Sequence, residues 1–219
     1  MRPDQEIFEE ATMSHHYQYL IIGAGMTADA AVQGIREVDA QGTIGVVGAE
    51  MDRPYNRPPL TKGLWKGDSL ESIWRKETEG HADLHLGRTI KALDLWRRQV
   101  TDDRGGTIGF DKLLLATGGT PRRLPFGGDD IIYYRTVRDY LRVRELTQKG
   151  KRFAVLGGGF IGSEIAAALA LNRKEVIMLF PGMAVGARMF PRDLSLHLNS
   201  YYEEHGVELR PGSRACGVE

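Results

Sequence analysis

The stretch "IIGAGMTA", residues 21–28, joins a strand-like run to a helical pattern and decides the fold. Tyr17 to Ile22 is a short apolar run that stops at a glycine, as a buried parallel strand does. Apolar residues then recur at helical spacing as far as Val38, and a second β-rich run covers Thr43 to Gly48. Strand, glycine turn, helix and strand in this order predict a βαβ unit of a parallel sheet.

The same order returns at "VLGGGFIGSE", residues 155–164. Strands are predicted at Arg152 to Leu156 and Glu175 to Phe180, with a glycine-rich turn and an apolar helix stripe between them. The chain therefore predicts an α/β fold with two Rossmann-like dinucleotide-binding domains, the second of them incomplete. Their expected bounds are 17–120 and 121–219, after a disordered N-terminus at 1–16.

Three features are expected between the two units. A Pro-rich loop covers residues 53–62, "RPYNRPPLTK", and a β-hairpin is predicted around residues 101–107, "TDDRGGT". A strand from Lys112 to Ala116 then ends in "TGGTP" and leads to the second unit.

Composition excludes several classes of protein. The 219 residues carry 29 basic and 29 acidic side chains, so no basic field favours nucleic acid or an anionic membrane surface. Cys216 is the single cysteine, which excludes an internal disulfide framework and a CxxC redox pair within this chain. No apolar run approaches the roughly 20 residues of a membrane span. The acidic start is unlike a leader peptide, and we expect a cytoplasmic protein.

In the first glycine turn, residues 23–28, each small residue has a physical reason. Gly23 permits a tight exit from the strand, Gly25 lets the backbone approach a pyrophosphate, and Ala28 allows close packing of the helix. The helix dipole favours phosphate at this end. Glu50 follows the next strand, where an acid can bind a ribose hydroxyl. The turn is predicted to bind a dinucleotide.

The second glycine turn, residues 157–162, keeps all three glycines, but its second strand is followed by "PG" and no acid. An acid there would favour NAD and clustered arginines NADP. Arg173 and Arg188 are too far apart in sequence to decide between them. The choice of nicotinamide cofactor stays open.

With both turns placed, the chain resembles the two-dinucleotide flavoproteins of the pyridine nucleotide-disulfide reductase type, and within them the apoptosis-inducing factor and bacterial ferredoxin reductase branch. Five stretches carry the resemblance: "GAGMTA", "PYNRPPLTKGLW", "LLLATGGTPR", "YRTVRDY" and "GGGFIGSE" with "EVIMLFPG" after it. It implies FAD in the first domain and NADH, with NADPH not excluded, in the second.

The resemblance also implies site residues. Lys62, near the reactive flavin edge, would pair with Glu164 near the nicotinamide, and both would be catalytic as well as cofactor-binding. The further FAD contacts would be Gly23, Ala24, Gly25, Met26, Thr27, Glu50, Arg57, Ile90, Thr117, Gly118 and Arg135, and the further nicotinamide dinucleotide contacts would be Gly158, Gly159, Phe160, Ile161 and Arg188. Gly182 departs from the apoptosis-inducing factor pattern, which has an acid there.

The expected activity is that of an FAD-dependent NAD(P)H oxidoreductase, in which hydride passes to flavin N5 and electrons leave to a ferredoxin-like protein, a quinone or oxygen. The resemblance allows a homodimer of the full-length protein. The family continues beyond residue 219, so we expect an N-terminal fragment. Two alternatives stay open: a redox-responsive flavoprotein that senses NADH and changes partner binding with little turnover, or a truncated form with impaired activity.

Simpler explanations exist for some of these residues. Lys62 would by default be a solvated loop lysine, and an acid such as Glu164 in a first helical turn is favoured by the dipole alone. His81 and His85, at i and i+4, would share a helix face as a metal pair, but no third ligand is near in sequence and no metal site is expected. Cys216 is expected to be an incidental thiol in a strand.

Overall fold

The computed structural model describes residues 13–76 and 78–217. The chain divides into two compact units. Unit 1 contains Met1–Asn56 and Ile73–Gly119, and unit 2 contains Arg57–Ser72 and Thr120–Glu219. Residues 57–72 therefore belong to unit 2, although they are flanked in sequence by unit 1.

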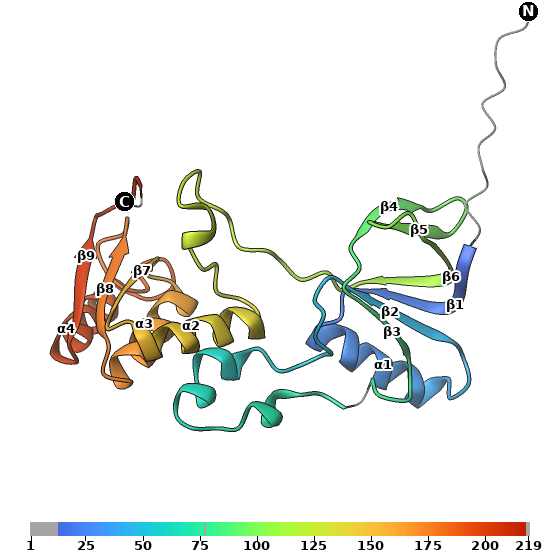
Figure 1. Ribbon diagram of the computed structural model, residues 1–219, viewed down its shortest axis with the longest axis horizontal. Helices are drawn as coiled ribbons and strands as arrows, with labels where there is room; N and C mark the ends of the chain where they lie inside the picture. The colour runs from blue at the N-terminus through green and yellow to red at the C-terminus, as the bar shows by residue number, and fades with distance from the viewer. Residues whose placement is uncertain (1–12, 77, 218–219) are drawn as a thin grey trace, which may run out of the picture. The chain divides into compact units, whose positions relative to one another are not determined.

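Unit 1 is a six-stranded mixed sheet with one covering helix (Figure 1). Its strand order is β3-β2-β1-β6-β5-β4, and β3, β2, β1 and β6 run parallel. The strands are β1 Met13–Ile22, β2 Ile44–Gly48, β3 Asp83–Leu86, β4 Ile90–Asp94, β5 Gln99–Asp102 and β6 Thr107–Leu115, and the helix is α1 Met26–Val38.

The two faces of this sheet pack against different cores. Ile21 and Val46 face Val32 of α1, so the predicted apolar stripe of this helix lies on the sheet. Leu20 and Val47 point to the other face, where they pack with Val100 of β5. Because successive residues of a strand alternate between faces, an almost fully apolar strand is buried on both sides.

The first strand is longer than the sequence predicted. Residues 13–16, assigned above to a disordered N-terminus, extend β1 and pair with the start of β6, with His16 opposite Gly109. The assignment failed because backbone pairing, which holds these residues, does not require an apolar pattern. Residues 1–12 lie outside the described residues.

The predicted hairpin is confirmed. β5 and β6 are antiparallel, with Val100 opposite Ile108. The Asp102 carboxylate accepts the backbone N–H groups of Arg104 at 2.9 Å and Gly106 at 2.8 Å, and so closes the turn between the strands.

Unit 2 contains a three-stranded parallel sheet in the order β7-β8-β9 (Figure 1). The strands are β7 Arg152–Leu156, β8 Glu175–Phe180 and β9 Val207–Pro211, and the helices are α2 Val137–Lys149, α3 Phe160–Leu171 and α4 Arg192–Glu204. Its short 3₁₀ helices are η1 Pro58–Thr61, η2 Gly63–Trp65 and η4 Gly128–Asp130, and η3 Leu70–Ile73 ends at the first residue of the second unit 1 segment. Both units contain the strand, turn, helix and strand order of a Rossmann-like fold, as predicted.

Residues 58–65 are attached to unit 2 through backbone carbonyls. The Leu60 carbonyl accepts hydrogen bonds from Trp65 Nε1 at 2.8 Å and from the Tyr134 hydroxyl at 2.5 Å. Asn172 Nδ2, at the end of α3, donates to the Trp65 carbonyl at 3.1 Å. Trp65 is buried, and the Arg144 guanidinium lies over its ring at 5.1 Å from the centroid. These contacts place Lys62, which lies between Leu60 and Trp65, against α3.

Candidate dinucleotide and redox site

The first glycine turn follows β1 in unit 1, and its geometry requires glycine. Gly23 has φ +114°, and a Cβ on it would lie 2.0 Å from the Ala116 carbonyl oxygen. Its N–H donates to the Val47 carbonyl at 2.7 Å. Gly25 then precedes α1 and supplies no capping side chain, so the amino end of the helix presents backbone N–H groups without a side-chain acceptor on its cap.

Other predicted FAD contacts gather at the same end of the sheet. Ala116 N–H donates to the Ile22 carbonyl at 2.7 Å, which brings Thr117 and Gly118, just after β6, beside the turn. Glu50 follows β2, and its carboxylate accepts the Tyr55 hydroxyl at 2.6 Å. The structure thus brings together residues 23–27, 50 and 117–118 at the carboxyl ends of three parallel strands, where α/β folds bind ligands.

Ile90 follows a segment that is hydrogen-bonded to the end of β2, next to Glu50. The Gly87 N–H donates to the Glu50 carbonyl at 3.0 Å and the Arg88 N–H donates to the Gly48 carbonyl at 2.9 Å. Ile90 begins β4 two residues later and packs, half-buried, against the sheet core. Its backbone is therefore held near the end of β2.

The second glycine turn follows β7 in unit 2 and has the same backbone conformation. Gly157 has φ +119°, and its N–H donates to the Leu179 carbonyl at 2.9 Å. A Cβ on Gly162 would lie 2.0 Å from the Gly157 carbonyl oxygen, so the helix packs tightly on the turn. A Cβ on Gly159 would meet nothing within 4 Å. The open space at Gly159 is what a pyrophosphate needs to approach the backbone.

The loop after β8 lies beside this turn. The Gly186 N–H donates to the Gly158 carbonyl at 2.8 Å. Arg188 follows on the same loop and is exposed, as are Phe160 and Ile161 at the start of α3. Gly158, Gly159, Phe160, Ile161 and Arg188 are therefore neighbours in unit 2. Both glycine turns fit a dinucleotide by backbone conformation, by the glycine at each helix start and, in the second turn, by the open space.

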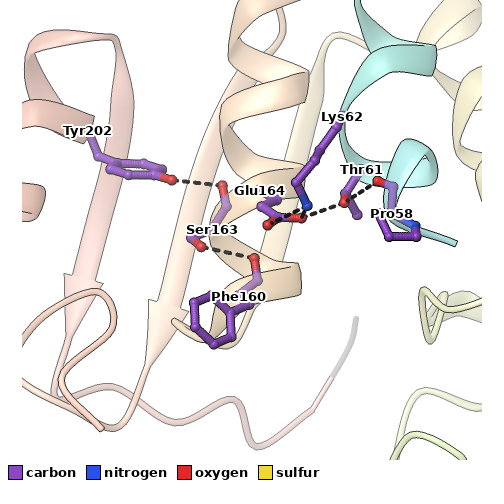
Figure 2. A network of polar contacts seen from close by, with 7 residues as sticks. All are labelled: Pro58, Thr61, Lys62, Phe160, Ser163, Glu164 and Tyr202. Atoms are coloured by element: carbon purple, nitrogen blue, oxygen red, sulfur yellow. Dashed lines mark hydrogen bonds and ion pairs between the residues drawn. The ribbon is translucent and has the colours of Figure 1, made fainter. Parts of the chain in front are cut away.

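The predicted Lys62–Glu164 pair is present within unit 2. Lys62 Nζ lies 2.8 Å from each carboxylate oxygen of Glu164 (Figure 2). The Lys62 side chain is 55% exposed and that of Glu164 is 27% exposed, so the pair faces solvent on one side. Lys62 is thus a partly solvated lysine, as its simpler explanation had it, and it also has an ion-pair partner in α3.

The helix dipole does not account for Glu164. α3 begins at Phe160 and has no acidic residue in its first turn, so Glu164 lies one turn further in than expected. Its partners are instead Lys62 and Thr61, whose Oγ1 lies 2.5 Å from Glu164 Oε2 (Figure 2). Thr61 was missed by the sequence analysis, although its position beside Lys62 in "RPPLTK" was a usable signal.

A second contact supports α3 next to this pair. The Tyr202 hydroxyl of α4 donates to the Ser163 carbonyl at 3.0 Å (Figure 2). Burial raises the pKa of Tyr202, and the nearby Glu164 carboxylate adds to the effect. The Tyr202 hydroxyl therefore stays protonated, and a hydrogen-bond donor, at neutral pH.

Arg57 and Arg135 also belong to unit 2. Arg57 Nη1 donates to the Arg135 carbonyl at 3.1 Å, and the Arg135 N–H donates to Asp139 Oδ2 at 3.0 Å. The structure brings these two together, and the predicted FAD contacts are divided between unit 1 and unit 2.

Two minor expectations are wrong in detail. His81 lies in a turn and His85 in β3, so they share no helix face; His85 Nε2 lies 2.8 Å from the Tyr17 hydroxyl. Within residues 13–76 and 78–217 no three His, Cys, Asp or Glu side chains cluster as metal ligands would. Cys216 is exposed and lies beyond β9 instead of in a strand, because that strand ends at Pro211.

None of the helices in the described part of the chain is both long and apolar enough to cross a bilayer.

Comparison with known proteins gives a consistent set of relatives. A family model described as pyridine nucleotide-disulphide oxidoreductase matches residues 17–219. The chain is 33% identical over 236 residues to the mitochondrial Apoptosis-inducing factor 1 of Dictyostelium discoideum, covering 95% of this chain and 44% of that one. It is 30% identical to the ferredoxin–NAD(+) reductase component of the biphenyl dioxygenase system of Paraburkholderia xenovorans (strain LB400), covering 91% and 50% of the two chains.

A solved structure agrees in fold. The reductase in the covalent putidaredoxin reductase–putidaredoxin complex superposes with a TM-score of 0.82 at 28% identity, over 94% of this chain and 52% of that one. The chain therefore spans about half the length of the relatives it matches.

Proposed function

Because the chain belongs to the pyridine nucleotide-disulphide oxidoreductase family, we propose that it forms the N-terminal part of an FAD-dependent NAD(P)H oxidoreductase. The observation that carries this proposal is the Lys62–Glu164 ion pair beside the second glycine turn. A charged pair one turn into the helix that follows a dinucleotide-fitting glycine turn is suited to controlling charge during transfer of hydride.

The residues that would hold the two cofactors follow from the two turns. In unit 1, residues 23–27, Glu50, Ile90, Thr117 and Gly118 would contact FAD. In unit 2, Arg57, Lys62 and Arg135 stay the FAD contacts that the resemblance predicts. Residues 158–161, Glu164 and Arg188 would bind the nicotinamide dinucleotide. When bound, the flavin supplies a site at N5 that accepts hydride, two electrons and one proton, from the nicotinamide and later releases the electrons.

The side chains of this chain contribute charge and orientation. The Lys62 ammonium would stabilise negative charge that develops on the cofactor as it is reduced. Glu164 holds that ammonium between its two carboxylate oxygens and would orient the nicotinamide carboxamide. Each turn contributes helix N–H groups toward a pyrophosphate.

For the electron acceptor we propose a ferredoxin-like protein, with a quinone or oxygen as alternatives. Support comes from the similarity to a reductase solved in a covalent complex with putidaredoxin and to a ferredoxin–NAD(+) reductase component. A homodimer of the full-length protein and a cytoplasmic location stay predictions.

The test uses the product of the complete reading frame, purified with its flavin. NADH should bleach the flavin absorbance, and Lys62→Ala should slow that reduction at least about tenfold, because one charge-stabilising contact is worth more than about 1.4 kcal/mol. Lys66→Ala, an exposed lysine on the same segment, is the matched control and should leave the rate unchanged. A colourless protein that takes up no FAD would refute the proposal.

The 33% identity to an apoptosis-inducing factor favours one second candidate, a flavoprotein that responds to NADH by changing partner binding with little turnover. Steady-state assays with an artificial acceptor distinguish the two. Rapid turnover supports the enzyme, whereas a persistent long-wavelength absorbance band and an NADH-dependent change in oligomeric state support the switch. The same assay on residues 1–219 alone tests whether this form is impaired.

A further inference from the structure

We propose that Thr61 is a positioning residue for the Lys62–Glu164 pair, acting through a hydrogen bond from its hydroxyl to Glu164. This role rests on the proposed function for its catalytic consequence, but the contact itself lies wholly within unit 2. Thr61 is 6% exposed, so its hydroxyl has little access to water and depends on protein partners.

The direction of the hydrogen bond follows from counting protons. Thr61 Oγ1 has two acceptors in reach, Glu164 Oε2 at 2.5 Å and the Pro58 carbonyl at 3.2 Å (Figure 2). A hydroxyl has one proton and can donate fully to one of them. A carboxylate paired with an ammonium is ionised, and hydroxyl-to-carboxylate hydrogen bonds are the shorter and stronger kind. Thr61 therefore donates to Glu164.

The consequence is that Glu164 is held from two sides. Lys62 Nζ contacts both carboxylate oxygens at 2.8 Å, but Lys62 is more than half exposed and an exposed ammonium alone fixes a partner weakly. The buried Thr61 hydroxyl sits on η1, which the Tyr134–Leu60 hydrogen bond attaches to unit 2. It thus supplies the rigid contact that keeps the Glu164 carboxylate, and with it Lys62, in one orientation.

Thr61→Val tests the proposal because it keeps the branched shape and removes the hydroxyl. In the flavin-loaded product of the complete reading frame, the limiting rate of flavin reduction by NADH should fall about tenfold, the loss expected from one charge-assisted hydrogen bond. The dissociation constant for NADH should stay within about twofold, because the backbone N–H groups of the turn bind the pyrophosphate. Thr61→Ser, which restores the hydroxyl, should recover most of the rate.

Two further measurements separate positioning from loss of structure. In the Glu164→Ala background, Thr61→Val should have no additional effect on the rate, since its partner is gone. In the protein without flavin, side-chain coupling constants of labelled Glu164 should report one rotamer in the wild type and averaging in Thr61→Val. The matched control is Thr147→Val in α2, which removes a buried hydroxyl bonded to a carbonyl three residues earlier and touches neither Lys62 nor Glu164.

The outcomes are distinct. Wild-type protein that NADH does not reduce refutes the proposed function, whereas the rotamer measurement still tests the contact. Wild-type protein that is reduced normally, with Thr61→Val equally fast or equally ordered at Glu164, refutes the role of Thr61. An equal loss of rate in Thr147→Val, or full additivity with Glu164→Ala, refutes it as well, because both would mark a general loss of stability.

Discussion

The two glycine turns share one backbone conformation but are supported differently. Gly23 and Gly157 have φ of +114° and +119°, and each donates its N–H to the neighbouring strand. On Gly23 a Cβ would strike the Ala116 carbonyl, because β6 lies on the other side of β1. On Gly157 a Cβ would meet nothing within 4 Å. The first turn therefore requires glycine for two reasons and the second for one.

The turns differ again after the second strand. In unit 1, Glu50 follows β2 and is fixed by the Tyr55 hydroxyl. In unit 2, Gly182 takes the corresponding place, and residues 181–191 contain no acid. The helices differ as well: when the two glycine turns are aligned, Glu164 of α3 corresponds to Ala30 of α1. The motif specifies the backbone, and the residues around it determine which chemistry each turn serves.

Gly23→Ala should have the largest effect. A non-glycine residue at this φ costs about 1–3 kcal/mol, and overpacking against a backbone atom adds about 1–3 kcal/mol, so unit 1 should lose about 2–6 kcal/mol. Gly157→Ala should lose only the first of these contributions. Chemical denaturation of both variants measures the difference. Equal losses would show that β6 does not constrain the first turn.

The next largest effect should come from a buried acid in unit 1. Asp29 in α1 is fully buried, and it accepts hydrogen bonds from Arg75 Nε at 2.5 Å and from the Thr78 hydroxyl at 2.5 Å. Asp29→Ala leaves these two donors and the Thr78 backbone N–H without this acceptor. It should cost about 2–4 kcal/mol, because Arg75 is partly solvated. The corresponding residue of α3 is Ser163, whose hydroxyl donates to the Phe160 carbonyl. Ser163→Ala should therefore cost under about 1 kcal/mol. Denaturation experiments measure both losses, and equal losses in Asp29→Ala and Ser163→Ala would contradict the prediction.

The long-range contacts around Gly23 and Asp29 mark the limit of what the sequence could predict. Local patterns were sufficient for both βαβ units and for the hairpin, because apolar period and turn residues are local properties. Arg75, the ion-pair partner of the buried Asp29, is 46 residues away, and nothing in the period of α1 indicates it. The start of β1 at Met13 was missed for the same reason, since pairing with β6 is not local.

The site shows the same division. The glycines could be predicted from spacing, and the Lys62–Glu164 pair only from resemblance, because 102 residues separate the two side chains. The position of Thr61 beside Lys62 marks it as a candidate, but its contact with Glu164 could not be predicted, since it depends on η1 packing against α3. Sequence patterns predicted which residues are candidates for the site, and the fold determined which of these side chains are in contact.

A buried phenol makes unit 1 sensitive to alkali. Burial, with the Asp83 carboxylate as hydrogen-bond acceptor, raises the pKa of Tyr17 to about 12. The unfolded chain releases this proton near pH 10. The contribution of Tyr17 to the free energy of unfolding is therefore fully present below pH 10, and it falls by about 2 kcal/mol as the pH rises to about 12. Tyr17→Phe should lower stability at neutral pH and flatten this decline. Hydrogen exchange of the β1 and β3 amides, followed as a function of pH, measures this decline in stability. Parallel declines in the wild type and in Tyr17→Phe would contradict its attribution to Tyr17.

Gly182→Glu should change the choice of cofactor at the second turn. A Cβ on Gly182 would meet its nearest neighbours at 3.7 and 3.8 Å, which is ordinary contact, so an acid fits there. A carboxylate favours the free ribose 2′-hydroxyl and repels a 2′-phosphate. The ratio of kcat/KM for NADH over NADPH should rise about tenfold, the size of one favourable polar contact. Gly119→Glu, at an exposed and open position of unit 1, is the control and should leave the ratio unchanged.

The smallest effect should come from a buried hydroxyl in unit 2, which contrasts with Asp29. Ser195 of α4 is 1% exposed, and its Oγ has no hydrogen-bond partner among the described residues. It borders a cavity of about 460 Å³ whose other lining residues are Met183, Ala184, Ala187, Arg192 and Leu196. An unsatisfied buried hydroxyl costs free energy, so Ser195→Ala should raise the free energy of unfolding by up to about 1 kcal/mol. Urea denaturation measures the change. A loss of stability would show that the hydroxyl is satisfied in solution.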